Sequence, residues 1–362
     1  MRSSGQQRGP SIARAQGVEW GVVRVLVGSS DSLIARLGRL AVLFPVRARA
    51  WYHAPRRGSI TRGGGCYDRR PVPELPDLAI LADAFQAGLV GRPLEAVQAP
   101  QSLVVRGTPE EQRALIGQSL EAVTRRGKFL TLAFSRDRVV LNPMLTGRLG
   151  LAAPGQKAFS NTAVVWRFGG RPAGAAPKVV APWTRGASWL AADEVPLELR
   201  YRDPTRMGKV YLAPAGVTRP IPGWDEQGPD ADDPTLDLAT WRARIARHSG
   251  ELKNLLKNQA FVAGIGNGYS DEILWAGRLA PFRGRSTLAS EEVDTLHEAM
   301  REVIPWAIAE LRTRVPPHFE VEVRDFLRVH RKGGQPCPRC GTTLSEIAPG
   351  GFVTTFCRGC QR

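Results

Sequence analysis

The stretch "LKNLLKNQAFVAGIGNGYSDEILWAG" (residues 252–277) decides the fold of the C-terminal half. Apolar residues at helical spacing run into a glycine turn, and a second helix is expected to begin at about Tyr269. Gly264, Gly266 and Asn267 allow positive φ and leave backbone N–H groups unobstructed. Such a turn at a helix N-terminus can hold a phosphate oxygen, and a simple tight turn is the alternative interpretation.

Four cysteines in the last 30 residues follow the pattern C-x2-C-x16-C-x2-C; they are Cys337, Cys340, Cys357 and Cys360. Each C-x2-C pair directs two thiolates at one point, and four thiolates complete a tetrahedral zinc shell. Disulfides are the alternative, which a cytoplasmic protein disfavours. We expect one structural zinc ion in a β-hairpin zinc ribbon, with no coordination position left for catalysis.

Basic residues surround this cysteine module; they are Arg324, Arg328, Arg331, Lys332, Arg339, Arg358 and Arg362. A zinc ribbon with a basic rim commonly lies on a phosphate backbone. A solvated basic surface with no partner is the alternative.

Periodicity along the rest of the chain predicts an α+β multidomain protein. Residues 73–213 begin with a helix and continue in short strands bounded by Gly, Pro and Asp, which is typical of a β-sandwich. Residues 214–234 are rich in Pro, Gly and Asp and are predicted to be a linker. Residues 235–325 are expected to be helical, and 326–362 to form the zinc ribbon.

The composition points to a polyanionic partner. The 362 residues include 50 Lys+Arg against 34 Asp+Glu, a formal net charge of +16, which favours nucleic acid. No uninterrupted apolar run of about 18 residues occurs, so no membrane partner is expected. We expect a cytoplasmic, nucleoid-associated bacterial protein.

The first fifth of the chain carries most of that charge. Residues 1–72 hold 13 Arg, no Lys and 3 acidic residues, a net of +10. Arg without Lys is what a GC-rich reading frame gives when it is translated by accident. The segment is therefore expected to be a mistranslated leader, and a disordered basic arm is the alternative.

Four elements now occur in one order: P-E-L-P at 73–76, "RRGKFL" with Lys128, "VAGIGNGY", and the terminal cysteine module. This order resembles the formamidopyrimidine-DNA glycosylase / endonuclease VIII family of base-excision repair enzymes, over residues 73–362. The resemblance implies an N-terminal β-sandwich facing a helix–two-turn–helix domain with a zinc ribbon. It also implies a monomeric glycosylase and AP lyase that acts on double-stranded DNA containing damaged bases or abasic sites.

The resemblance further implies the site residues. Pro73 would be the amine nucleophile, Glu74 the carboxylate that transfers protons, and Lys128 the lysine near the lesion. The implied DNA contacts are Lys253, Gly266 and Asn267 at the glycine turn, Arg206 on a phosphate, and Leu145 and Met207 as apolar wedges. An α-amino group titrates near neutral pH, so part of it is free to attack.

Several positions depart from the family pattern. Leu145 stands where Met is usual, and Thr205 and Met207 stand where Arg and Phe are usual. Phe352 replaces an arginine that usually contacts a phosphate. The stretch 312–327 is short and is expected to lack the loop that covers an everted oxidised purine, so oxidised pyrimidines or a broader set of lesions remain open.

The position of Pro73 within the chain conflicts with a role as an amine nucleophile. Its nitrogen is an amide in the Val72–Pro73 bond of this chain and cannot act as a nucleophile. We expect translation to start at Val72, with the initiator removed to free Pro73. The alternative function is that of a non-catalytic DNA-binding descendant of the family. The alternative role of Pro73 is that of a proline that simply starts a helix.

Overall fold

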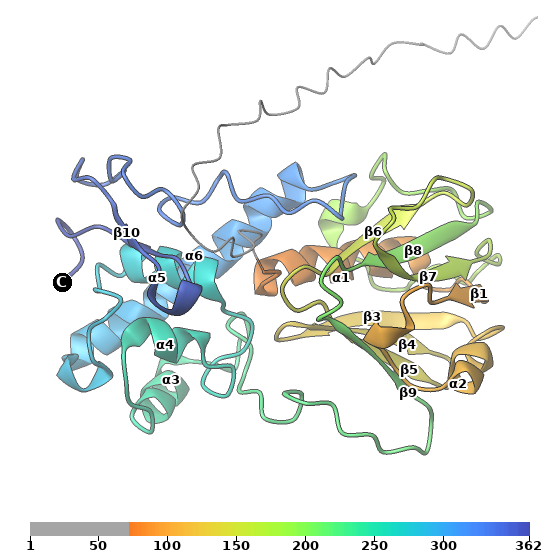
Figure 1. Ribbon diagram of the computed structural model, residues 1–362, viewed down its shortest axis with the longest axis horizontal. Helices are drawn as coiled ribbons and strands as arrows, with labels where there is room; N and C mark the ends of the chain where they lie inside the picture. The colour runs from red at the N-terminus through yellow and green to blue at the C-terminus, as the bar shows by residue number, and fades with distance from the viewer. Residues whose placement is uncertain (1–71) are drawn as a thin grey trace, which may run out of the picture. The chain divides into compact units, whose positions relative to one another are not determined.

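The computed structural model describes residues 72–362 (Figure 1). The predictions for residues 1–71 lie outside this range. None of the helices in the described range is both long and apolar enough to cross a membrane.

The N-terminal domain begins with helix α1 (Leu75–Leu89). The Asp77 carboxylate accepts the Glu74 N–H at 2.8 Å, which satisfies a backbone donor that the first turn leaves unpaired. Leu78, Leu81 and Phe85 are buried on one face, as the helical spacing predicts.

Two mainly antiparallel sheets follow α1. The five-stranded sheet has the order β2 (Val105–Arg106), β9 (Lys209–Ala213), β5 (Arg138–Asn142), β4 (Phe129–Phe134) and β3 (Leu120–Arg126). The four-stranded sheet has the order β1 (Leu94–Gln98), β7 (Thr162–Phe168), β8 (Leu197–Arg202) and β6 (Arg148–Ala152). Only β2 and β9 pair in parallel among these strands.

The two sheets pack face to face (Figure 1). Along β8, Leu197, Leu199 and Tyr201 are buried and alternate with half-exposed residues, the period of a strand with one face in a core. The rings of Phe134 and Phe168, one from each sheet, stack with centroids 6.3 Å apart. The predicted β-sandwich is confirmed.

Two elements of this domain were not predicted from the sequence: strand β9 and helix α2 (Pro109–Ala114). The run that forms β9 is only five residues long, and it follows a loop directly. It becomes a strand because it lies between β5 and β2, and both of these supply its hydrogen-bonding partners.

Residues 214–237 contain no helix or strand in the described chain, as expected for a connection between domains. Their C-terminal part is nonetheless held to the β3–β4 turn. Arg125 pairs with Asp230 at 2.8 Å and with Asp232 at 2.7 Å, and Asp230 also accepts the Gly127 N–H at 2.6 Å. The exact domain boundaries stay predictions.

The helical domain contains α3 (Leu238–Ile245), α4 (Leu252–Lys257), α5 (Asn267–Ala276) and α6 (Ser290–Arg314). Helix α5 begins two residues earlier than Tyr269, the expected start. Trp241 is fully buried and packs on Phe261 with centroids 4.8 Å apart, while its indole N–H is donated to the Val293 carbonyl at 3.0 Å. A buried indole with a partnered N–H anchors this core.

The zinc module is a hairpin of β10 (Ser345–Ile347) and β11 (Thr354–Phe356). Short 3-10 helices lie in the connections of the described chain: Ser102–Val104, Pro182–Thr184, Arg285–Thr287 and Pro349–Gly351. The α+β architecture with a helical domain and a terminal zinc ribbon is confirmed.

Two acids of α5 bind this module to the helical domain. Asp271 accepts bonds from His330 Nδ1 at 2.7 Å and from the Thr355 N–H at 3.1 Å. Glu272 accepts the N–H groups of three consecutive residues, 328–330, at 2.8–2.9 Å. Burial raises the pKa of Glu272, and those bonds oppose the rise. The sequence predicted a helix that begins near these two acids, and the structure buries their carboxylates against the zinc module.

The glycine turn before α5 receives the start of α1. The Leu75 N–H is donated to the Gly264 carbonyl at 2.9 Å. Gly264 has φ +95°, and a Cβ there would lie 2.6 Å from the Leu75 Cβ. Only glycine satisfies both the backbone conformation and the close approach.

We predict that Gly264→Ala destabilises the protein more than Gly250→Ala. Gly250 has φ +96° and nothing within 4 Å of the point where a Cβ would lie, so it reports the conformational cost alone. The clash with Leu75 should lower the free energy of unfolding by about 1–3 kcal/mol more. Urea denaturation of both variants measures the difference, and equal destabilisation would contradict the close-packing argument.

Candidate functional site

The Glu74 carboxylate lies at the N-terminus of α5. It accepts the N–H groups of Gly266 at 2.5 Å, Gly268 at 2.8 Å and Tyr269 at 3.3 Å. A Cβ on Gly266 would lie 2.5 Å from Glu74 Cδ, so the close approach also requires glycine here. The sequence pattern suggested a phosphate oxygen at this turn; in the structure a carboxylate of the protein itself takes these amides.

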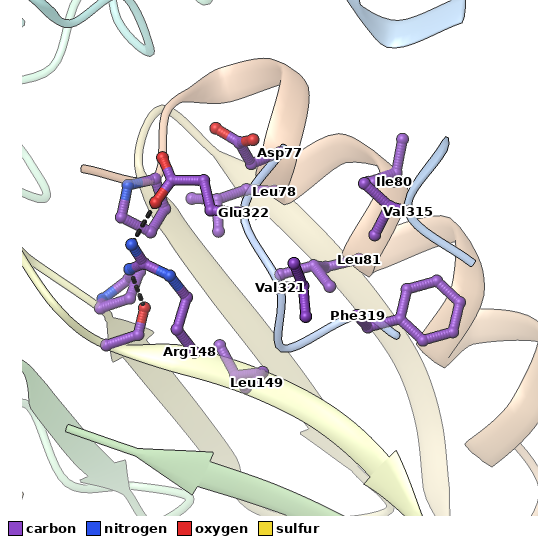
Figure 2. Close-up of a pocket in the computed structure, with 13 residues that line it drawn as sticks. Asp77, Leu78, Ile80, Leu81, Arg148, Leu149, Val315, Phe319, Val321 and Glu322 are labelled. Carbon is purple, nitrogen blue, oxygen red and sulfur yellow. Dashed lines mark hydrogen bonds and ion pairs between the residues drawn. The ribbon is translucent and has the colours of Figure 1, made fainter. Parts of the chain in front are cut away.

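A pocket opens beside Pro73 (Figure 2). The hollow is shallow: its empty volume of about 380 Å³ includes open solvent, and the space that can hold water is about 20 Å³, roughly one molecule. The apolar lining comes from α1, β6 and the segment after α6; it includes Leu78, Leu81, Leu149, Val315, Phe319 and Val321.

Four charged side chains form the polar side of this pocket and the layer behind it. Arg148 pairs with Glu322, Glu322 with Arg324 at 2.7 Å, and Arg324 with both oxygens of Asp77 at 2.6 Å (Figure 2 shows the Arg148–Glu322 pair). Burial raises the pKa of Glu322 to about 7, against the opposing effect of Arg324. The pocket therefore contains a carboxyl group that changes charge near neutral pH.

Lys128 lies in the β3–β4 turn and is half-buried. Burial lowers its pKa, the Glu74 carboxylate opposes this shift, and repulsion from Lys257 adds to it. Within residues 72–362 its ammonium group has no hydrogen-bonding or ion-pair partner. A half-buried, unpaired lysine beside a carboxylate is a candidate binding or catalytic group.

Lys253 and Asn267 both donate to the carbonyl of Val353, at 3.0 and 2.6 Å. Lys253 is buried and also pairs with Asp271 at 2.5 Å. Burial lowers the pKa of Lys253, while Asp271 raises it. The two residues expected to hold a phosphate are thus brought together, but on an acceptor of the zinc hairpin.

The expected wedges lie on two exposed loops. Leu145 and Met207 are 37% and 43% exposed, and Met144, which was not singled out from the sequence, is 38% exposed. Large apolar side chains rarely gather on a surface without a partner.

Asp203 joins these two loops by accepting hydrogen bonds from both of them. It is fully buried and accepts bonds from the Thr146 hydroxyl, from the N–H and hydroxyl of Thr205, and from the Gly208 N–H at 2.7 Å. Thr205, which stands at a usual arginine position, therefore points into the loop junction. Arg206 adopts φ +57° beside it and is exposed.

Part of the expected basic rim has a structural role. Arg324 is buried in the ion pair with Asp77 rather than lying on the surface of the zinc module. Arg339 stacks 4.1 Å from the Trp275 ring centroid, and Arg328 lies 4.2 Å from that of Trp306. These side chains join the zinc module to α1, α5 and α6, so spacing in the sequence overstated the free basic surface.

The four cysteine Sγ atoms all lie within 4.8 Å of one another. Two of the cross pairs, Cys337–Cys360 and Cys340–Cys357, are 3.8 and 3.4 Å apart, close to the S···S edge of about 3.8 Å in a tetrahedral Zn–S4 centre. All four are unbridged thiols. The set fits one structural zinc ion, as predicted.

Comparison with known proteins is consistent with this arrangement. The formamidopyrimidine-DNA glycosylase N-terminal domain matches residues 72–210, the H2TH domain of that enzyme matches 227–315, and the zinc finger found in FPG and IleRS matches 334–362. The class is a three-part protein of β-sandwich, helix–two-turn–helix domain and zinc finger.

Similar proteins of known name point to the same family. Formamidopyrimidine-DNA glycosylase of Thermomicrobium roseum is 32% identical over 308 residues, covering 80% of this chain and 99% of the relative. That of Geobacillus kaustophilus is 30% identical, covering 80% of this chain and 100% of the relative. The chain belongs to the formamidopyrimidine-DNA glycosylase family.

Solved structures share the fold. The Lactococcus lactis glycosylase bound to DNA containing an AP site superposes with a TM-score of 0.64 at 24% identity, covering 80% of this chain and 99% of that one. The complex of the same enzyme with DNA containing Fapy-dG gives 0.65 at 23% identity, covering 80% and 100%.

We predict that the purified protein contains one zinc ion and that Cys340→Ser loses it. Removing one of four thiolates opens the coordination shell. Zinc released on denaturation can be measured with a colorimetric chelator. Arg358→Ala, an exposed change in the same module, should retain the metal. Full zinc content in Cys340→Ser would contradict the assignment.

We predict that Glu322 makes folding stability fall as pH rises. Its folded pKa of about 7 exceeds its ordinary value of 4.5, so the folded state holds the proton more tightly. The contribution is present below the ordinary value and is lost as pH rises through about 7. In Glu322→Gln this part of the fall should disappear, measured by urea denaturation at about pH 5 and about pH 8. Glu320→Gln is the neighbouring control and should keep the slope.

Proposed function

We propose that this protein is a bifunctional DNA glycosylase and AP lyase that uses the Pro73 amine as its nucleophile. The supporting observation is the junction at the start of α1, where Pro73 lines a pocket and the next residue, Glu74, is held by three amides of α5. The proposed nucleophile, which lines the pocket, and the carboxylate are thus consecutive residues of one segment.

In the proposed reaction the secondary amine attacks C1′ of the damaged nucleotide and the base leaves. The nitrogen loses its proton and the sugar ring opens to give a Schiff base with C1′. Elimination at the 3′ and then the 5′ phosphate nicks the strand. Each elimination breaks a C–O bond as a proton leaves the neighbouring carbon, so the atoms balance without any added oxidant or reductant.

Glu74 supports the proton transfers of this scheme. Its carboxylate is adjacent to Pro73 in the chain and is fixed by α5 rather than by a mobile loop, so it is positioned before substrate arrives. Lys128, which has no partner among residues 72–362, is the candidate cation for the DNA backbone beside the lesion.

The everted base is proposed to lie at the open mouth of the pocket beside Pro73. The apolar side chains there suit a planar ring, and Arg148 and Glu322 lie on the polar side. The exposed loop residues Met144, Leu145 and Met207 are proposed to fill the gap left in the duplex. DNA with damaged bases or abasic sites, bound by a monomer, is the proposed substrate.

A non-catalytic damaged-DNA-binding protein is the second candidate. One observation favours it: in the 362-residue chain the Pro73 nitrogen is an amide and carries no nucleophilic lone pair. The two candidates differ in covalent chemistry and not in DNA binding.

We predict that a chain starting at Pro73 forms a borohydride-stable adduct with abasic-site DNA. The unprocessed chain of residues 1–362 should form none. Borohydride reduces the Schiff base to an amine, which gel electrophoresis detects and peptide mass spectrometry assigns. Pro73→Ala retains a primary N-terminal amine and should trap more weakly. DNA binding without any adduct from the Pro73-started chain would favour the second candidate.

A further inference from the structure

Lys257 is a basic residue that neither the family pattern nor the proposed mechanism uses. It is the last residue of α4, one helical turn after Lys253, so both side chains lie on the same face. That face meets the zinc hairpin at two consecutive residues. Lys253 binds the Val353 carbonyl, and the Lys257 ammonium lies 5.1 Å from the centroid of the Phe352 ring.

The side chain of Lys257 is half-buried, and within residues 72–362 its only direct partner is that ring. Burial lowers its pKa, and the carboxylates of Asp271 and Glu74 oppose the shift. Both of these acids are already engaged: Asp271 pairs with Lys253, and Glu74 accepts three backbone N–H groups. Neither forms an ion pair with Lys257 itself.

Lys128 faces the same region from the other domain. Its turn packs against the glycine turn of the helical domain, since a Cβ on Gly127 would lie 3.2 Å from the Ala263 Cβ. Burial lowers the pKa of Lys128, and repulsion from Lys257 adds to this shift. Two like charges held near each other, neither of them in an ion pair within residues 72–362, form a site that an anion between them would stabilise.

We propose that Lys257 is a DNA-contacting residue that, together with Lys128, binds one backbone phosphate beside the lesion. This inference rests on the proposed function, because it requires DNA in the space between the two domains. Phe352 is exposed and stands where the family usually has a phosphate-binding arginine. Lys257 would supply the positive charge that this arginine provides in the family. In this chain the cation comes from α4 instead of the zinc hairpin.

The ligand is a phosphodiester and not a carboxylate or a base. Two ammonium groups that form no ion pair within residues 72–362 match a tetrahedral anion, and neither offers the planar, two-pronged geometry that reads a base edge. Glu74 accepts amides of the same glycine turn against which the turn of Lys128 packs, which places the phosphate next to the proposed reaction centre.

We predict that Lys257→Met weakens binding to a duplex that carries a tetrahydrofuran abasic analogue, by roughly 5–10-fold at moderate salt. The slope of log Kobs against log[salt] should become shallower by a part of about 0.9, the value for one whole phosphate contact, because Lys128 remains on the same phosphate. Fluorescence anisotropy over a salt series measures both quantities. Met keeps the stem of the side chain, and thermal unfolding and zinc content verify that the variant is folded.

Three further variants sharpen this test. Lys257→Arg should keep the wild-type slope. Lys178→Met, which removes an exposed lysine of the N-terminal domain, should leave the slope unchanged. Adding Phe352→Arg to Lys257→Met should restore the slope, because the guanidinium returns a cation to the same place. An unchanged slope in Lys257→Met, or an equal loss in Lys178→Met, would overturn the proposal.

The source of the phosphate contact can be checked with the DNA itself. Single phosphates beside the abasic analogue can be replaced by uncharged methylphosphonates. At one position the loss of affinity should be larger for wild type than for Lys257→Met. Absence of any such position would also overturn the proposal. Borohydride trapping is read separately: no adduct from the Pro73-started chain defeats the proposed lyase, while the salt slope still tests Lys257.

Discussion

A carboxylate bound to the first turn of a helix is the interaction on which this structure depends. Glu74 belongs to the N-terminal domain by sequence, yet its oxygens accept amides of α5 in the helical domain. The positive end of the helix dipole and three unpaired N–H groups favour an anion there. Two glycines, Gly264 and Gly266, are required because any side chain would collide with Leu75 or Glu74. The position of Pro73 follows from this contact.

Much of the architecture could be predicted because its signals are local. The cysteine spacing defines a metal site whatever surrounds it, and the spacing of Leu78, Leu81 and Phe85 predicted α1 with its buried face. β8 lies within the stretch predicted to form short strands, and its buried residues alternate as a sandwich requires. The resemblance supplied the candidate site residues, and the structure brings Glu74, Lys128, Gly266 and Asn267 into one region.

What the sequence could not reveal depends on contacts between distant residues. Arg324 was grouped with the zinc module by its neighbours in the chain, but its partner Asp77 lies 247 positions away. Asp271 and Glu272 suit the first turn of a helix, and only the fold brings the zinc module to their carboxylates. Lys257 could have been noticed from its spacing of four from Lys253. Its approach to Phe352 could not, because that contact joins two modules.

The shared bond of Lys253 and Asn267 to Val353 gives the metal an influence beyond folding its own hairpin. The acceptor is the backbone carbonyl of the residue directly before β11, the strand that leads into Cys357, so its place depends on the hairpin being formed. If the metal were lost, Lys253 would keep only Asp271 as a partner, and the Asn267 amide would lose its acceptor. The arrangement of both side chains therefore depends on metal content, so the availability of zinc in a cell bears on more than the stability of the hairpin.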